Sequence, residues 1–151
     1  DGKRFALPRP LLHKKEANLA CTFSLSGLKT AVRRQWEALG ETHPQDQADM
    51  AASFQEAVGD ILASRLSNAL GAKSAQTQAL KHVVLAGGVA ANAYLRRRLE
   101  DVVARFGLIL VAPPPKLCTD NAVMVAWCGV EKSLCGPPDP LDFAPRPRWP
   151  L

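Results

Sequence analysis

The fold of this chain is indicated most clearly by the stretch His82-Val-Val-Leu-Ala-Gly-Gly-Val-Ala-Ala-Asn92. Residues 83–85 form a short apolar run rich in β-branched side chains, which is typical of a buried strand. Gly87 and Gly88 carry no side chain, so they allow the backbone to turn and to approach a ligand closely. A helix beginning there would point its free N–H groups at an anion. We therefore predict a strand, a ligand-facing glycine turn and a helix start, although a double glycine also serves simply to pack a helix on a sheet.

The longest predicted helix precedes this stretch and begins at Asp46. Its apolar residues recur at three- and four-residue steps, which form one stripe over about six turns. The stripe comprises Met50, Phe54, Ala57, Val58, Ile61, Leu62, Leu66 and Leu70. Gly71 is well placed to end this helix.

The remaining segments complete an α/β pattern, which favours a sheet covered by helices. Further helices are predicted over 28–38, 89–105 and 119–134, a strand over 108–112, and a strand or extended segment over 22–25. The last helix is expected to bury Val123, Met124, Trp127 and Val130. The chain of 151 residues is of a length that suits a single domain, which we assign to 1–136. An extended Pro-rich tail is predicted over 137–151.

Composition predicts a soluble cytoplasmic protein with reduced thiols. The apolar runs are far shorter than the roughly 20 residues that span a bilayer, and no leader-like pattern stands at the start. The four cysteines include no Cys-x-x-Cys pair. The formal net charge of +5 suits an anionic partner such as RNA.

Three basic clusters are candidate phosphate contacts, namely Lys14–Lys15, Arg33–Arg34 and residues 96–98. The alternative for the last cluster is that it forms the solvated side of a helix. The opposite side of that helix faces the core through Leu95, Leu99, Val102 and Val103. Aromatic residues are not interleaved with these clusters, as they are in platforms that stack single-stranded bases.

Three segments together resemble the TsaD family of tRNA N6-adenosine threonylcarbamoyltransferases. They are Phe23-Ser-Leu-Ser-Gly-Leu-Lys-Thr-Ala31, Ala86-Gly-Gly-Val-Ala-Ala-Asn92 and Pro113-Pro-Pro-Lys-Leu-Cys-Thr-Asp-Asn121. The resemblance implies two ribonuclease-H-like lobes around a nucleotide cleft, as in the actin, heat-shock-protein and sugar-kinase (ASKHA) architecture. The family's His-x-x-x-His metal motif has no counterpart among His13, His43 and His82. We therefore expect the chain to be the second, C-terminal lobe of a larger enzyme.

The resemblance assigns substrate binding to the glycine motif. It places Gly87 and Gly88 against the adenosine part of the ligand, and it makes Asn92 a contact of threonylcarbamoyl-adenylate. A carboxamide offers both donors and acceptors, which suits this task. The alternative is that Asn92 only caps the first turn of the helix that follows.

Asp120 is the metal ligand that the resemblance implies. The implied metal is Fe²⁺, with Zn²⁺ or Mg²⁺ as alternatives, and carboxylates bind divalent cations of these kinds. The other reading is electrostatic, because an aspartate in the first helical turn after Thr119 as N-cap is also favourable. A stable site normally takes three or more protein ligands, so this chain alone is expected to hold metal weakly or not at all. Cys118 fits a packed thiol better than a ligand.

The implied reaction moves a threonylcarbamoyl group from its adenylate to N6 of the adenosine beside the tRNA anticodon. The implied partners are tRNA and the accessory proteins TsaB and TsaE, or a second copy in a homodimer. Two alternative functions stay open. The first is a non-catalytic nucleotide-binding module that serves in assembly, and it predicts that a metal ligand is missing. The second is a metallopeptidase, although the chain has no His-Glu-x-x-His motif. The lobe alone is expected to be inactive and to dimerise through its uncovered apolar face.

Ser24, Ser26 and Lys29 are not interpreted as a nucleophile and its base. They lack the Gly-x-Ser-x-Gly elbow, and serines beside a glycine are ordinary turn residues.

Overall fold

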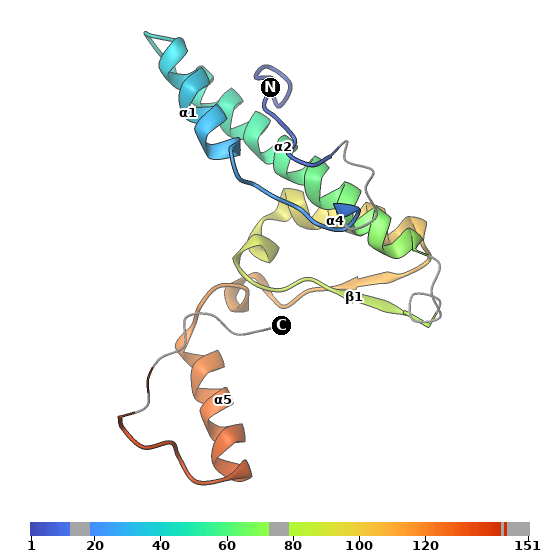
Figure 1. Ribbon diagram of the computed structural model, residues 1–151, viewed down its shortest axis with the longest axis vertical. Coiled ribbons are helices and arrows are strands. Elements are labelled where there is room, and N and C mark those ends of the chain that lie inside the picture. Colours follow the sequence, from blue (N-terminus) through green and yellow to red (C-terminus); the bar gives the residue numbers. More distant parts are fainter. Residues whose placement is uncertain (13–18, 73–78, 143, 145–151) are drawn as a thin grey trace.

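The computed structural model describes residues 1–12, 19–72, 79–142 and 144. Its elements follow in the order α1 (Leu28–Ala38), α2 (Pro44–Gly71), β1 (His82–Val84), η2 (Gly88–Ala91), α4 (Ala93–Arg105), β2 (Ile109–Val111), η3 (Pro115–Leu117) and α5 (Ala122–Cys135), where η marks a 3-10 helix (Figure 1). Lys14–Lys15, His13 and most of the predicted tail lie outside the described residues. Among the described helices, none has the length and apolarity needed to cross a membrane.

The two strands form a parallel sheet, which confirms the α/β prediction at its coarse level. His82 pairs with Ile109, and Val84 pairs with Val111. The ladder continues one residue beyond β1, because the Leu85 N–H donates to the Val111 carbonyl at 2.9 Å. One face of this sheet is open to solvent, since Val84, Ile109 and Val111 are 72%, 60% and 45% exposed. The predicted strand over 22–25 is not formed, and the segment has no regular structure.

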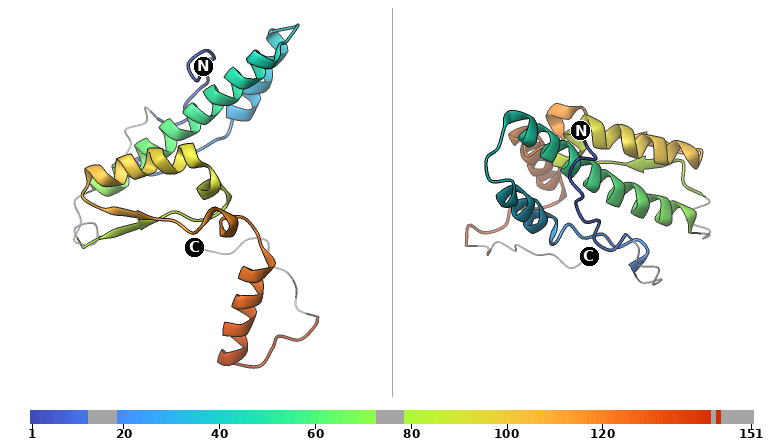
Figure 2. Two further views of the ribbon diagram at one scale, coloured as in Figure 1. Left: turned by 180° about the vertical axis from the view of Figure 1, so that it is seen from behind. Right: turned by 90° about the horizontal axis from the view of Figure 1, so that it is seen from above.

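The core lies where α2 packs on α4. Figure 2 shows α4 between α2 and the two strands, and seen from above the two helices run side by side. Ile61 of α2 and Val103 of α4 are fully buried, and Leu95, Leu99 and Val102 are nearly so. The predicted stripe of α4 is thereby confirmed. In the stripe of α2, Met50, Ala57, Val58 and Ile61 are buried, Leu62, Leu66 and Leu70 are half-buried, and Phe54 is 39% exposed.

Charged side chains clamp the same two helices together. Arg98 of α4 donates to Glu56 at 2.8 Å and also pairs with Asp60, both on α2. Arg9 donates to the other oxygen of Asp60 at 2.8 and 3.0 Å. The Tyr94 hydroxyl donates to Glu56 and accepts from Arg98. The pKa of Glu56 is lowered, first by the Tyr94 hydrogen bond and then by the one from Arg98.

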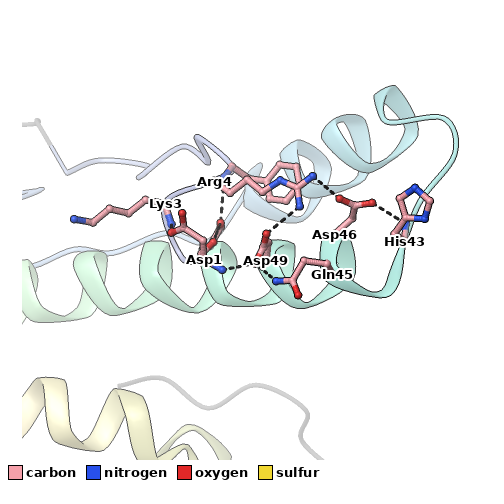
Figure 3. A network of polar contacts seen from close by, with 9 residues as sticks. Asp1, Lys3, Arg4, His43, Gln45, Asp46 and Asp49 are labelled. Carbon is pink, nitrogen blue, oxygen red and sulfur yellow. Dashed lines mark hydrogen bonds and ion pairs between the residues drawn. The ribbon is translucent and has the colours of Figure 1, made fainter.

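The start of α2 is held by a second polar network, which Figure 3 shows. The His43 N–H donates to Asp46 Oδ2 at 2.7 Å, closing a capping box, so the helix begins at Pro44 rather than at Asp46. Arg4 pairs with Asp46 and, at 2.9 Å, with Asp49. The pKa of Asp46 is lowered, first by the His43 N–H and then by Arg4. Residues 1–7 are thus fastened along α2, where Leu7 enters the core.

The last helix departs most from the prediction. It begins at Ala122 rather than at Thr119, and it extends away from the other elements in Figure 1. Its apolar residues are exposed, contrary to expectation: Val123, Met124, Trp127 and Val130 are 70%, 50%, 66% and 53% accessible. Apolar spacing reports a face suited to burial but not the surface that covers it. The described part of the chain offers α5 no such surface.

Candidate ligand cavity

The glycine turn after β1 has a backbone that only glycine adopts readily. Gly87 has φ 81° and ψ 178°, a region closed to side chains by steric clash. A Cβ atom built on Gly87 or Gly88 would meet no atom within 4 Å, so the space beside both is open. The predicted helix start at Val89 is wrong, because a 3-10 turn forms there and the Ala90 N–H donates to the Gly87 carbonyl.

Asn92 separates that 3-10 turn from α4. Its backbone is extended, with φ −77° and ψ 110°, and its Oδ1 accepts from the Leu95 N–H at 3.0 Å. The capping interpretation of Asn92 is therefore confirmed. Its substrate role stays a prediction, and a cap leaves the carboxamide nitrogen outside this hydrogen bond.

Asp120 follows η3 on an exposed part of the backbone. Asn121, not Thr119, caps α5, because its Oδ1 accepts from the Met124 N–H at 2.8 Å. The first-turn interpretation of Asp120 is therefore wrong, since this residue precedes the cap. Within the described residues, no ion pair or hydrogen bond engages its carboxylate, which leaves it available to a ligand.

The two motifs meet at one cavity of about 470 Å³. Gly87 and Gly88 of the glycine turn line it, together with Thr119 and Asp120 of the second motif. The remaining lining residues are Ala86, Pro113, Leu117, Cys118 and Met124. Asn92 is not among them. The structure thus brings together three of the four residues predicted for the site, from segments separated by α4 and β2.

Arg96 connects two segments that contribute to this cavity, whereas the sequence offered it only as a candidate phosphate contact or a solvated side chain. Its Nη2 donates to the Ala90 carbonyl at 2.8 Å and to the Pro113 carbonyl at 3.0 Å. The prediction of a solvated arginine face holds for Arg97, which is exposed, and is wrong for Arg96 and Arg98, which are half-buried and bonded within the chain. One sequence feature could have indicated the contacts of Arg96. This residue stands four residues after Asn92 in a predicted helix, and a helical side chain at that spacing lies back over the preceding turn.

Cys118 is the packed thiol that the sequence suggested. It is 4% exposed, and its Sγ lies 3.4 Å from the Pro113 carbonyl oxygen and 3.6 Å from Arg96 Nη2. Buried among these groups, it lines the cavity wall and fixes the backbone that leads to Asp120.

A metal ion would find a single suitable ligand at this cavity. Asp120 provides a free carboxylate, the donor that hard and borderline cations accept. Across residues 1–12, 19–72 and 79–142, no three His, Cys, Asp or Glu side chains gather into a group that could hold a metal. Asp120 therefore fits as one contributor to a metal site whose other ligands lie elsewhere, and the metal itself stays a prediction.

A larger groove, of about 720 Å³, lies between α1 and α2 and contains none of the predicted site residues. It is lined by Lys29, Val32, Trp36, Gln47, Met50, Ala51 and Phe54. Volume alone would favour this groove, but the cavity between the two motifs carries the carboxylate and the glycine turn.

Comparison with known proteins yields one consistent result. A family model described as tRNA N6-adenosine threonylcarbamoyltransferase matches residues 1–127. Proteins of that name are similar in Rhodospirillum rubrum (52% identity, covering 100% of this chain and 41% of the relative), in Rhodopseudomonas palustris strain BisA53 (50%, covering 99% and 40%) and in Brucella suis (51%, covering 100% and 42%). The chain spans about two fifths of the length of these relatives and matches their C-terminal portion.

Proposed function

This chain belongs to the TsaD family of tRNA N6-adenosine threonylcarbamoyltransferases, and from this we propose that it supplies one wall of an adenylate-binding transferase site. The complete protein moves a threonylcarbamoyl group from threonylcarbamoyl-adenylate to N6 of the adenosine beside the tRNA anticodon. In this step the bond between the carbamoyl carbon and the phosphate oxygen breaks, and the same carbon bonds to N6. AMP leaves, and N6 loses a proton.

The observation that carries the proposal is the cavity shared by Gly87, Gly88 and Asp120. Its volume of about 470 Å³ lies within the range of roughly 300–1,000 Å³ that small-molecule sites occupy. The donor is already activated, so the protein contributes mainly position and charge stabilisation. A cavity lined by both an open glycine turn and a carboxylate without a partner among the described residues suits that contribution.

Each predicted site residue has a distinct role in this proposal. The glycine turn admits the adenosine closely, because a Cβ at either glycine would occupy the open space beside the backbone. Asn92 lies outside the lining of this cavity, and in this proposal its carboxamide nitrogen contacts a part of the adenylate that extends beyond it, while Oδ1 stays on the Leu95 N–H. Asp120 holds a divalent metal together with ligands from outside the described residues. The metal proposed for Asp120 is Fe²⁺, with Zn²⁺ or Mg²⁺ as alternatives, and it would supply polarisation or orientation of the donor.

The architecture proposed for the whole protein is the two-lobed ASKHA type, with residues 1–136 in the second lobe and 137–151 as an extended tail. The small parallel sheet with helices is consistent with it. The exposed face of the sheet and the uncovered α5 support burial against further protein. The proposed partners are tRNA, TsaB and TsaE, or a second copy, and the proposed location is the cytoplasm, where tRNA is modified.

The test is a transfer assay with the full-length protein that contains this chain. Threonylcarbamoyl-adenylate, TsaB and TsaE are supplied with an unmodified tRNA transcript, and the modified nucleoside is quantified by mass spectrometry. We expect modification of the transcript, and none when the adenosine beside the anticodon is replaced by guanosine. Asp120→Asn should abolish most of the transfer, because the amide is a poor metal ligand.

Two results would overturn the proposal. Adenylate binding without any transfer by the wild-type protein would favour the assembly module. Peptide cleavage that depends on Asp120, in the absence of tRNA modification, would favour the metallopeptidase. Transfer that is unaffected by Asp120→Asn would leave the reaction standing and remove Asp120 from it.

A further inference from the structure

Three consecutive arginines on α4 have three different surroundings. Arg97 is exposed. Arg98 turns to α2, where it pairs with Glu56 and Asp60. Arg96 instead donates to the carbonyls of Ala90 and Pro113, and Pro113 lines the cavity of the two motifs. Adjacent residues of one type therefore provide matched controls for one another.

The guanidinium of Arg96 binds two segments that each contribute residues to the cavity walls, namely η2 through Ala90 and the segment after β2 through Pro113. Its Nε and Nη2 donate to the Ala90 carbonyl at 3.1 and 2.8 Å, and Ala90 is fully buried two residues after the glycine pair. The same Nη2 donates to the Pro113 carbonyl at 3.0 Å and lies 3.6 Å from Cys118 Sγ. One planar cation thus connects η2 to the segment between β2 and η3.

These walls have little regular structure to hold them. η2 is four residues long and η3 is three. Residues 113–115 are prolines and have no N–H groups to pair with β1 or η2. Hydrogen bonds from a charged donor to carbonyl oxygens are stronger than neutral ones, and a planar fork fixes direction as well as distance. Beyond the β1–β2 ladder, Arg96 is thus a side-chain bridge between the glycine turn and the segment that leads to Asp120.

We infer that Arg96 is a positioning residue of the transferase site, one that sets the distance between the glycine turn and the Asp120 segment. This inference rests on the proposed function. It also separates Arg96 from the candidate phosphate contacts, because its Nε and Nη2 donors are directed at backbone carbonyls rather than at solvent.

The experiment compares Arg96→Met and Arg96→Lys with Arg97→Met and Arg98→Met in the full-length protein. For each variant, kcat and the KM values for threonylcarbamoyl-adenylate and tRNA are measured, together with the thermal midpoint. Arg96→Met should raise the adenylate KM by about tenfold or more, since small misplacements in a site are costly, and leave the tRNA KM unchanged. The adenylate KM of Arg96→Lys should lie between those of the wild type and Arg96→Met, because an ammonium group keeps the charge but lacks the planar fork of the guanidinium.

The controls separate position from stability. Arg97→Met should match the wild type in every quantity, and Arg98→Met should lower the thermal midpoint without raising the adenylate KM. Hydrogen exchange supplies a readout that needs no activity: the amides of residues 88–92 should exchange faster in Arg96→Met and not in Arg98→Met.

Three outcomes would overturn the inference. An equal rise in adenylate KM for Arg98→Met would show that the effect follows overall stability. A rise in the tRNA KM alone would make Arg96 a phosphate contact. Unchanged exchange at 88–92 would show that the turn does not depend on Arg96. A wild-type protein that modifies no tRNA refutes the proposed function instead, and the exchange result still decides the role of Arg96 in holding the turn.

Discussion

At the scale of single residues, the glycine pair separates into two different requirements. Gly87 has a backbone conformation essentially restricted to glycine, with φ 81° and ψ 178°, whereas Gly88 has no positive φ. Neither would clash with a neighbour if a Cβ were added. The need for glycine at 87 is therefore conformational, whereas Gly88 has open space beside it, which the proposed ligand contact would use.

Gly87→Ala should lower the free energy of unfolding by about 1–3 kcal/mol, the cost of holding a residue with a side chain in that region. Gly88→Ala is the matched control, and we expect a change below about 1 kcal/mol. Urea unfolding followed by circular dichroism measures both. Equal losses in the two variants would contradict the conformational argument.

Asn92 combines a cap with a predicted contact, and two substitutions separate these roles. Asn92→Ala should destabilise the chain by about 1 kcal/mol because the Leu95 N–H loses its acceptor. Asn92→Asp keeps an acceptor at the cap, so stability should be preserved, but it lacks the amide donors and should weaken adenylate binding in the full-length protein. Calorimetric titration with the adenylate tests this. Undiminished binding by Asn92→Asp would leave Asn92 as a cap alone.

At the scale of elements, α2 and α4 are held by ion pairs in addition to their apolar stripes. Glu56 accepts from Tyr94 and Arg98, and its pKa lies below the ordinary value of 4.5 for these reasons, in that order. A carboxylate whose pKa is lower in the folded than in the unfolded state stabilises the fold fully above the unfolded value. That contribution is lost as the pH falls through the folded value.

The thermal midpoint of this chain should therefore fall as the pH is lowered below about 4.5. Glu56→Gln should already have a lower midpoint at neutral pH, and its decline on acidification should be shallower, because one of the titrating groups is gone. Calorimetric scans between neutral pH and about pH 3 compare the two proteins. Parallel declines would show that Glu56 does not contribute to the acid sensitivity.

At the scale of the whole molecule, apolar surface is left uncovered in two places. One is the outer sheet face at Val84, Ile109 and Val111. The other is a stripe on α5 formed by Val123, Trp127, Val130 and Leu134, which recur at helical spacing and are all more than half exposed. A helix with this much exposed apolar surface normally packs against another protein surface.

The chain by itself should consequently self-associate, as the sequence already suggested from its expected open face. The α5 double variant Trp127→Glu and Leu134→Glu should shift light scattering toward the monomer, since it places charges within the stripe. Arg97→Glu is the control, because it introduces a glutamate at an exposed position outside the stripe. It should leave the association unchanged. A sharp wild-type monomer at high concentration would contradict this prediction.

The sequence alone determined the features that arise from local spacing. The bounds of α1 agree with the prediction, and the buried stripe of α4 was identified residue by residue, because helical periodicity encodes both. The family resemblance, rather than local spacing, singled out Gly87, Gly88 and Asp120, and the structure places all three at one cavity. Helix starts were less accurate, since His43, Asn92 and Asn121 compete as caps with residues nearby.

Only the tertiary structure decided which distant groups meet. The partners of Arg96 are the carbonyls of Ala90 and Pro113, which any residue type would supply, so no sequence pattern marks them. The exposure of α5 was equally hidden, because an apolar stripe looks the same whether or not a surface covers it. Local preferences come from neighbours in the chain, whereas contacts and burial arise only when separate segments are brought together in space.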